Sequence, residues 1–160
     1  MTIQFIKQDL TKVVEDIFNV NGYVILHIGN CRGKMNLGLA LQIRNKWPQV
    51  YNDYKERETD KGLILKDVIE TAITETFSIY TLLAQENYGY TGVYINYDVL
   101  GECLNKVIEL EMLRNSKDVV SRNIYIPKYL GAGLGGGSWD IIYKIIESRL
   151  KDFNVFICEL

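Results

Sequence analysis

The sequence predicts an α/β fold: a three-layer α/β/α sandwich in which a mixed, mostly parallel sheet lies between helices. Short apolar segments typical of strands alternate along the chain with segments whose apolar residues recur every three or four positions, as in amphipathic helices. The length of 160 residues, with 48% hydrophobic and 24% charged residues, fits one domain with a sizeable core. We therefore expect a single domain over residues 1–160.

Six segments are expected to be strands, because they are short and rich in Ile, Val, Tyr and Phe. They span residues 3–6, 23–28, 63–71, 76–83, 123–126 and 155–158. Their order, with one helix between most of them, is the reason for expecting helices on both faces of the sheet.

Four intervening segments carry an apolar stripe and are expected to be helices. The stripes are Val13, Val14, Ile17 and Phe18; Leu37, Ala40 and Leu41; Leu100, Leu104 and Val107; and Ile142, Ile145 and Ile146. Pro48 is expected to end the second helix just after Trp47. Ligands of such sheets bind beyond the carboxyl ends of the strands, so we expect the site at the loops of residues 30–38 and 130–137.

Charge and cysteine content exclude several classes of partner. The 18 basic and 20 acidic side chains give a net charge of −2 without a basic run, which argues against direct nucleic-acid binding. Three widely spaced cysteines form neither a disulfide framework nor a zinc pattern, so we expect reduced thiols and no metal. The start of the chain lacks a secretory signal pattern, and no apolar run reaches about 20 residues. We expect a cytoplasmic monomer without a membrane span.

The most informative loop is glycine-rich and leads from a strand into a helix. Five of the seven residues at 131–137 are glycine, and Ser138 is a candidate N-cap for the helix that follows. Glycines allow positive φ and let backbone N–H groups converge on a phosphate, to which the helix N-terminus adds its positive end. The alternative is a simple flexible turn. The loop matches neither the dinucleotide-binding fingerprint nor a P-loop.

A second strand–loop–helix unit runs from His27 to Ala40. His27 is the only histidine, either a satisfied structural residue or, with its ordinary pKa, a group for proton transfer near neutrality. Asn30 can hydrogen-bond sugar hydroxyls, and Gly33 and Gly38 allow a ligand to approach the backbone.

Together these segments resemble the macrodomain family, in particular the branch of ADP-ribose 1″-phosphate phosphatases of fungi and phages. The resemblance covers nearly the whole chain, which would make it a single macrodomain. The elements that carry it are Gln8-Asp9-Leu10-Thr11, His27-Ile-Gly-Asn30-Cys31, Gly38-Leu-Ala40, Trp47-Pro48, Tyr51-Asn-Asp-Tyr54, the loop from Pro127 to Gly135, and the ending Val-Phe-Ile-Cys-Glu-Leu.

The resemblance implies ADP-ribose, or a derivative of it, as the ligand, with no cofactor. Adenine would lie against Asp9 and Leu10, although Asp9 is equally well an N-cap. His27 would be the catalytic acid and Asn30 would fix the distal ribose, while Arg32 or Lys34 could pair with the terminal phosphate. The remaining implied binding residues are Gly33, Met35, Gly38, Gly131, Ala132, Gly133, Leu134, Gly135, Gly136 and Trp139.

Departures from the family pattern leave the activity open. Asn36 occupies a position at which the family commonly has glycine. Gly135 stands where the branch that removes ADP-ribose from proteins has its acid, and residues 89–98 show no counterpart of that branch's lysine. The leading expectation is a phosphatase acting on ADP-ribose 1″-phosphate. The alternatives are a non-enzymatic ADP-ribose reader or sequestering protein, and a hydrolase of another ADP-ribosyl derivative.

Overall fold

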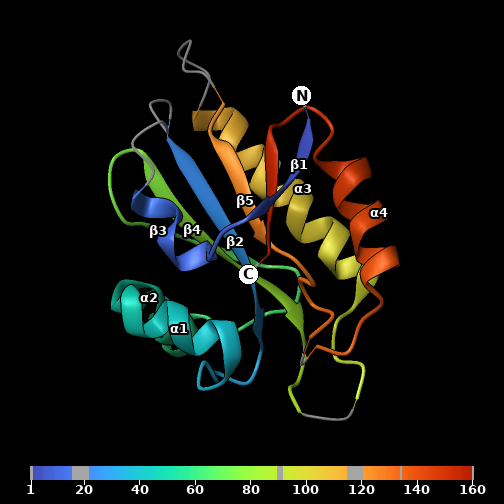
Figure 1. Cartoon of the computed structure of the whole chain (residues 1–160). Coiled ribbons are helices and arrows are strands. Elements are labelled where there is room, and N and C mark those ends of the chain that lie inside the picture. Colours follow the sequence, from blue (N-terminus) through green and yellow to red (C-terminus); the bar gives the residue numbers. More distant parts are fainter. Residues whose placement is uncertain (1, 16–21, 90–91, 115–120, 134, 160) are drawn as a thin grey trace.

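The computed structural model describes residues 2–15, 22–89, 92–114, 121–133 and 135–159 (Figure 1). Its strands are β1 (Ile3–Lys7), β2 (Tyr23–Asn30), β3 (Val68–Ala72), β4 (Phe77–Gln85), β5 (Asn123–Pro127) and β6 (Val155–Glu159). Its helices are the 3-10 helix η1 (Leu10–Glu15) and the α-helices α1 (Gly38–Lys46), α2 (Pro48–Asp60), α3 (Tyr97–Arg114) and α4 (Trp139–Arg149).

The six strands form one mixed sheet in the order β1-β6-β5-β2-β4-β3. All neighbours pair in parallel except β3, which runs antiparallel to β4 at the edge of the sheet. The central strands β2 and β4 are buried almost throughout, as expected of strands covered on both faces. The predicted three-layer sandwich is therefore confirmed.

Two apolar cores lie on opposite faces of this sheet. On one face, α3 and α4 pack Leu100, Leu104 and Ile146 against the strands. On the other face, η1, α1 and α2 contribute residues that include Ile43 and Tyr54. Because successive strand residues point to opposite faces, one strand supplies both cores. Among the described helices, none is both long and apolar enough to cross a membrane.

Three elements differ from the sequence-based expectations. The strand expected over residues 63–71 is observed only as β3, because Lys66 has a positive φ of 85° and the N–H of Asp67 closes a turn onto Ile64. The first helix is a 3-10 helix ending at Glu15, and the rest of its predicted stripe, Ile17 and Phe18, lies outside the described residues. Pro48 not only follows the end of α1 but also begins α2 at its first position, where proline costs no hydrogen bond.

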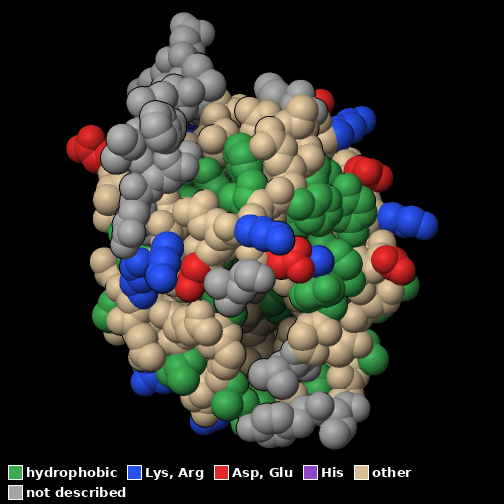
Figure 2. All heavy atoms as spheres, viewed as in Figure 1, with side chains coloured by type: hydrophobic (Ala, Val, Ile, Leu, Met, Phe, Trp, Pro, Cys, Tyr) green, Lys and Arg blue, Asp and Glu red, His purple; other side chains and the backbone are tan. Residues whose placement is uncertain are grey.

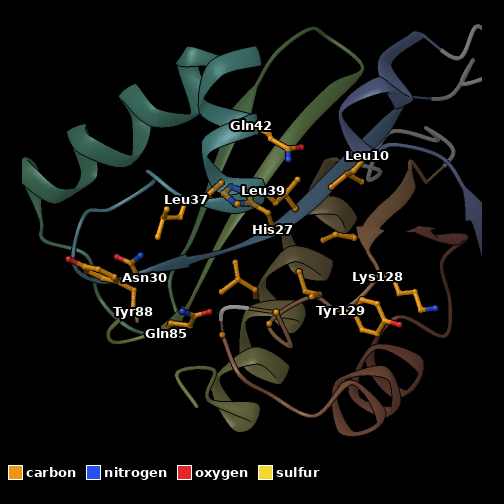
Figure 3. A pocket seen from close by; sticks show the side chains of 18 of the residues that line it. Leu10, His27, Asn30, Leu37, Leu39, Gln42, Gln85, Tyr88, Lys128 and Tyr129 are labelled. Atoms are coloured by element: carbon orange, nitrogen blue, oxygen red, sulfur yellow. The ribbon is translucent and has the colours of Figure 1, made fainter. Parts of the chain in front are cut away.

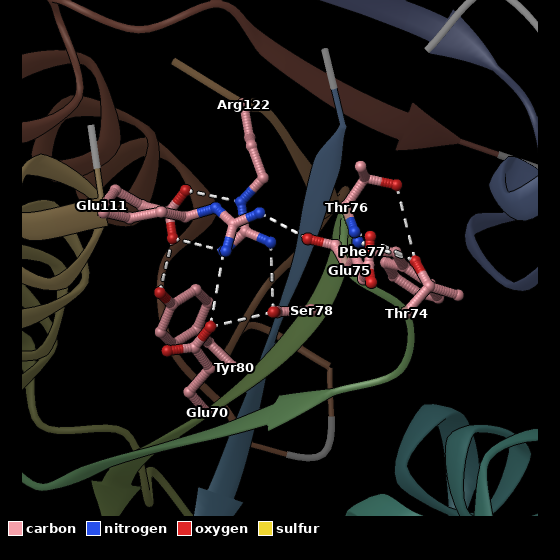
Figure 4. A network of polar contacts seen from close by, with 10 residues as sticks. Glu70, Thr74, Glu75, Thr76, Phe77, Ser78, Tyr80, Glu111 and Arg122 are labelled. Atoms are coloured by element: carbon pink, nitrogen blue, oxygen red, sulfur yellow. Dashed lines mark hydrogen bonds and ion pairs between the residues drawn. The ribbon is translucent and has the colours of Figure 1, made fainter. Parts of the chain in front are cut away.

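A buried ion-pair network lies at the amino-terminal end of the central strands, away from the loops that the sequence singled out (Figure 4). The fully buried Arg122 guanidinium donates from Nε to Glu111 at 2.9 Å and from Nη2 at 2.6 Å, and from Nη1 to Ser78 at 3.1 Å. The Tyr80 hydroxyl donates to Glu111 at 2.6 Å. Burial raises the pKa of Glu111, but the hydrogen bonds from Arg122 and Tyr80 outweigh it and hold that pKa below its usual range. The network joins α3 to the sheet.

Candidate ligand-binding pocket

A pocket of about 620 Å³ opens at the carboxyl ends of the strands, where the two loops expected to hold the site meet. Residues 36–40 and Gln42 form one wall, and residues 127–131 with Gly133 and Gly135 form the other. His27, Ile28 and Asn30 of β2 lie between the walls. The space-filling view shows the hollow near the centre of the molecule's face (Figure 2). Its location agrees with the rule for ligands of parallel sheets.

Figure 3 shows two chemically different ends of this pocket. Leu10, Lys128 and Tyr129 lie at one end, while Asn30, Gln85 and Tyr88 lie at the other. His27 lies between them. A ligand that spans the pocket therefore meets different side chains at each terminus.

His27 is buried at the base of the pocket, where only 1% of it is exposed. Its Nε2 lies 2.7 Å from the Thr81 hydroxyl oxygen, and its Nδ1 has no hydrogen-bond partner among the described residues. Burial lowers the pKa of His27 from 6.5 to about 4, because the charged imidazolium loses its hydration. The ring is therefore neutral at pH 7, and the expectation that its ordinary pKa suits proton transfer near neutrality is wrong.

Asn30 shapes the loop that follows β2. Its Oδ1 accepts the N–H of Arg32 at 3.0 Å, and its Nδ2 donates to the carbonyl of Lys34 at 3.0 Å. The Tyr54 hydroxyl donates to the carbonyl oxygen of Asn30 and lies 3.1 Å from its Oδ1. The side chain is thus held in place by its own loop and by α2, while it still lines the pocket.

Cys31, which follows this residue, is partly buried. Burial raises the pKa of the Cys31 thiol to about 11. The thiolate, which is the nucleophilic form, is therefore disfavoured at neutral pH.

The glycine-rich loop contributes three glycines to the lining of the pocket. Gly131, Gly133 and Gly135 line it, and their N–H groups have no partner among the described residues. Two other amides of the loop close turns within it. The Gly136 N–H donates to the carbonyl of Gly133, and the Gly137 N–H donates to that of Gly131, both at 3.0 Å. The three N–H groups of Gly131, Gly133 and Gly135 are therefore available as donors to a ligand bound in the pocket.

Packing explains several of these glycines. A Cβ on Gly135 would lie 2.5 Å from the carbonyl oxygen of Gly131, and one on Gly136 or Gly137 would overlap residues 92–95. Of the glycines in this loop, only Gly133 has open space where a Cβ would be added. Gly133, which lines the pocket, is therefore the position of this loop at which a Cβ can be added without meeting another part of the protein.

The helix that follows the loop begins at Trp139, with Ser138 at the N-cap. The Ser138 side chain makes no capping hydrogen bond, and its N–H donates instead to the Tyr97 hydroxyl at 2.8 Å. The predicted cap position is confirmed, but this N-cap residue is hydrogen-bonded through its backbone to the first residue of α3.

Asp9 and Leu10 line the pocket at the end where η1 begins. The Asp9 Oδ1 accepts the N–H of Thr11 at 2.9 Å and its hydroxyl at 2.8 Å, the pattern of a helix cap. These bonds lower the pKa of Asp9, so the carboxylate is charged at neutral pH. Its cap role leaves Oδ2 without a bond to a described residue, so that oxygen can accept a hydrogen bond from a ligand.

The structure places several predicted binding residues away from this pocket. Gly33 has a φ of 78° and faces the Glu58 carboxylate of α2, and Met35 is 1% exposed in the core. Ala132 and Gly136 belong to the loop but not to the pocket lining, and Trp139 lines a different hollow. Leu134 lies outside the described residues. The binding roles of these residues stay predictions.

The sequence did not point to several residues that line the pocket. Gln85 ends β4 directly beside Asn30, and Tyr88 follows it. Tyr129 has a positive φ of 67°, which is rare for a residue other than glycine and costs free energy. No motif marks these positions, because strand pairing and a loop turn bring them to the pocket.

Charges differ between the two ends. At the Leu10 end, Lys128 pairs with Glu159 at 2.9 Å, and Asp9 lies nearby on the same rim. At the Asn30 end, Lys34 is the charged residue among the described residues that line the pocket. No group of three or more His, Cys, Asp or Glu side chains within the described ranges could hold a metal ion.

Comparisons with known proteins agree on the fold. No protein-family model matches the chain. An uncharacterised 17.5 kDa protein from the tk-vs intergenic region of Enterobacteria phage T4 is 26% identical over 167 residues, which cover 99% of this chain and 97% of that protein. A structure of unknown function from Bacteroides thetaiotaomicron has a TM-score of 0.86 at 23% identity, over 100% of this chain and 99% of the other.

The names of two further solved structures state a fold family or a bound ligand. A macrodomain protein from Streptomyces coelicolor has a TM-score of 0.76 at 18% identity, over 99% of each chain. DarTG from Thermosipho africanus, solved in complex with ADP-ribose, has a TM-score of 0.69 at 18% identity, over 89% of this chain and 39% of that one. With its mixed six-stranded sheet, its helices on both faces and these structural neighbours, this chain has the macrodomain fold.

Proposed function

We propose that this protein binds ADP-ribose, or a derivative of ADP-ribose, in the pocket at the carboxyl ends of the strands. The observation that carries the proposal is that Gly131, Gly133 and Gly135 line the pocket near the start of α4, while their N–H groups have no partner among the described residues. Backbone donors near a helix N-terminus favour an anion, and a diphosphate spans several of them. The DarTG structure that shares this fold holds ADP-ribose.

The two ends of the pocket suit the two ends of this ligand. Adenine lies against Leu10, with its amino group donating to the free oxygen of Asp9. The diphosphate crosses the glycine-rich loop, and the distal ribose reaches Asn30 and Gly38. In this arrangement the apolar base and the polar sugar each meet a matching wall.

Gly133→Ala tests the site directly. The added methyl meets no protein atom within 4 Å, so the fold should be unchanged, and because Gly133 lines the pocket the methyl should narrow the proposed path of the diphosphate. Calorimetry should show ADP-ribose binding to the wild type and at least about tenfold weaker binding to Gly133→Ala, a loss of about 1.4 kcal/mol.

Ser138→Ala serves as the matched control, because its side chain makes no capping bond and it does not line the pocket. It should bind ADP-ribose like the wild type. Wild-type affinity in Gly133→Ala, or no ADP-ribose binding by the wild type, would contradict the proposal.

A phosphatase acting on ADP-ribose 1″-phosphate is the second candidate, and Lys34 is the observation that favours it. Lys34 lines the pocket, and its backbone carbonyl accepts a hydrogen bond from Asn30, so this cation belongs to the end where the terminal phosphate would be bound. The neutral His27 could orient water by a hydrogen bond, but it cannot supply a proton from an imidazolium at pH 7.

The low pKa of His27 also supports the remaining candidate, a reader that binds ADP-ribose without turnover. A phosphate-release assay with ADP-ribose 1″-phosphate separates the two. Release above the uncatalysed rate that is lost in His27→Ala supports the phosphatase, and tight binding without release supports the reader. Hydrolysis of another ADP-ribosyl derivative would be found by the same assay with an ester or glycosyl substituent in place of the phosphate.

A further inference from the structure

A second hollow, of about 300 Å³, lies beside the pocket and is lined mainly by aromatic side chains. Phe5 of β1 and Trp139 and Tyr143 of α4 form it, together with the charged residues Asp140 and Lys144. In the space-filling view, hydrophobic side chains gather over α4 beside the central hollow (Figure 2). We refer to these five residues as the aromatic hollow.

The rings are in contact with one another from the pocket to the hollow. Tyr129, which lines the pocket, packs edge-on against Trp139 with ring centroids 5.7 Å apart. Trp139 and Tyr143 lie 6.1 Å apart, and Tyr143 stacks on Phe5 at 5.7 Å. One pair of rings, Tyr129 and Trp139, therefore separates the aromatic hollow from the pocket.

Two features indicate that this strip of rings recognises a ligand. Phe5 is 53% exposed and Tyr129 is 51% exposed, although aromatic rings gain most when they are buried. Tyr129 also keeps a positive φ, a backbone strain that is typically retained at ligand sites. The Lys128 ammonium lies 5.0 Å from the centre of its ring, where it can also meet a phosphate.

We propose that the aromatic hollow binds the base of a second nucleotide that is covalently tethered to the adenosine end of a ligand in the pocket. The inference rests on the proposed function, because Asp9 and Leu10 place adenosine at the same end as Tyr129 (Figure 3). Rings such as Phe5 and Tyr143 stack on any base without reading its sequence. The net charge of −2 argues against binding along a nucleic-acid strand, but one tethered base needs no basic groove.

Calorimetry with three ligands tests the proposal: ADP-ribose, ADP-ribose carrying one adenylate on the adenosine 3′-hydroxyl, and a dimer of ADP-ribose joined through the adenosine ribose. The wild type should bind at least one of the two extended ligands about tenfold more tightly than ADP-ribose. The extended ligand that binds more tightly than ADP-ribose shows whether the second base comes from an oligonucleotide or from an ADP-ribose chain.

Phe5→Ala and Tyr143→Ala should lose this gain and keep the wild-type affinity for ADP-ribose, since neither residue lines the pocket. The exposed position of Phe5 makes its replacement tolerable for the fold, and a melting curve checks both variants. Ile141→Ala is the matched control, because Ile141 is an exposed apolar residue of α4 outside the hollow. It should keep the gain.

Four outcomes would overturn the inference. If ADP-ribose binds and neither extended ligand binds more tightly, or if Phe5→Ala keeps the gain, the hollow holds no second base. If Phe5→Ala converts a dimer into a monomer without changing the gain, the surface joins two copies of the chain. If ADP-ribose does not bind at all, the proposed function fails together with this inference.

Discussion

Protonation of His27 should destabilise the fold below about pH 6.5, and His27→Gln should remove that effect. The folded-state pKa of about 4 lies below the ordinary value of 6.5 because the ring is fully buried. As the pH falls through 6.5, the unfolded chain takes up a proton that the folded chain does not. The stabilisation is therefore complete above pH 6.5 and is lost progressively as the pH falls towards 4.

The size of the effect follows from the difference between the two pKa values. At about 1.4 kcal/mol for each pKa unit, the loss approaches about 3 kcal/mol below pH 4 and is roughly 2 kcal/mol at about pH 5. The pKa values of Asp9 and Glu111 are lowered in the fold from their ordinary values of 3.8 and 4.5, so the unfolded chain begins to protonate these carboxylates only near and below those values. Their stabilisation is lost only at lower pH, so they do not obscure the His27 effect.

Urea unfolding followed by tryptophan fluorescence measures this loss. Between about pH 8 and pH 5 the wild type should lose roughly 2 kcal/mol more stability than His27→Gln, whose side chain cannot titrate but can still hydrogen-bond the Thr81 hydroxyl. Equal losses in the two proteins would mean that His27 titrates normally in the fold. That result would refute the argument that burial lowers the pKa of His27. His27 would then again be a candidate catalytic acid at neutral pH.

Two further substitutions test the buried network and the distal end of the pocket. Glu111→Ala leaves the buried Arg122 without its main partner and should lower the free energy of unfolding by about 3–5 kcal/mol, whereas Glu102→Ala, which removes an exposed pair with Lys66, should cost less than about 1 kcal/mol. Similar losses in both would show that the Arg122 pair is no stronger than a surface pair. Lys34→Ala should weaken binding of ADP-ribose 1″-phosphate several-fold more than binding of ADP-ribose, and this difference should shrink at high salt. Equal effects on both ligands in calorimetry would remove Lys34 from the terminal phosphate.

Local patterns in the sequence were sufficient for the layers of the fold and for the two loops of the site. Strand alternation and helical stripes depend on neighbouring residues, and the buried strands β2 and β4 fall where continuous apolar runs predict them. The strand predicted over residues 63–71 was too long at its start, because Lys66 takes a positive φ. A lysine side chain does not predict that backbone conformation. The glycine pattern at 131–137 likewise identified the loop that lines the pocket.

Only the tertiary structure decided which chemistry each side chain can perform. His27 is a neutral ring because burial at the base of the pocket removes it from water, and no spacing in the sequence encodes that loss of hydration. Met35, next to the site in sequence, turns into the core, while Gln85, more than fifty residues from Asn30, pairs beside it.

The aromatic hollow also exists only in three dimensions, since it joins Phe5 of the first strand to Trp139 and Tyr143 of the last helix. The sequence therefore determined which loops line the pocket, because periodicity and glycine content are local. The protonation states and spatial neighbours of the side chains that line the pocket depend on burial and on contacts between distant segments. These arise only when the sheet assembles.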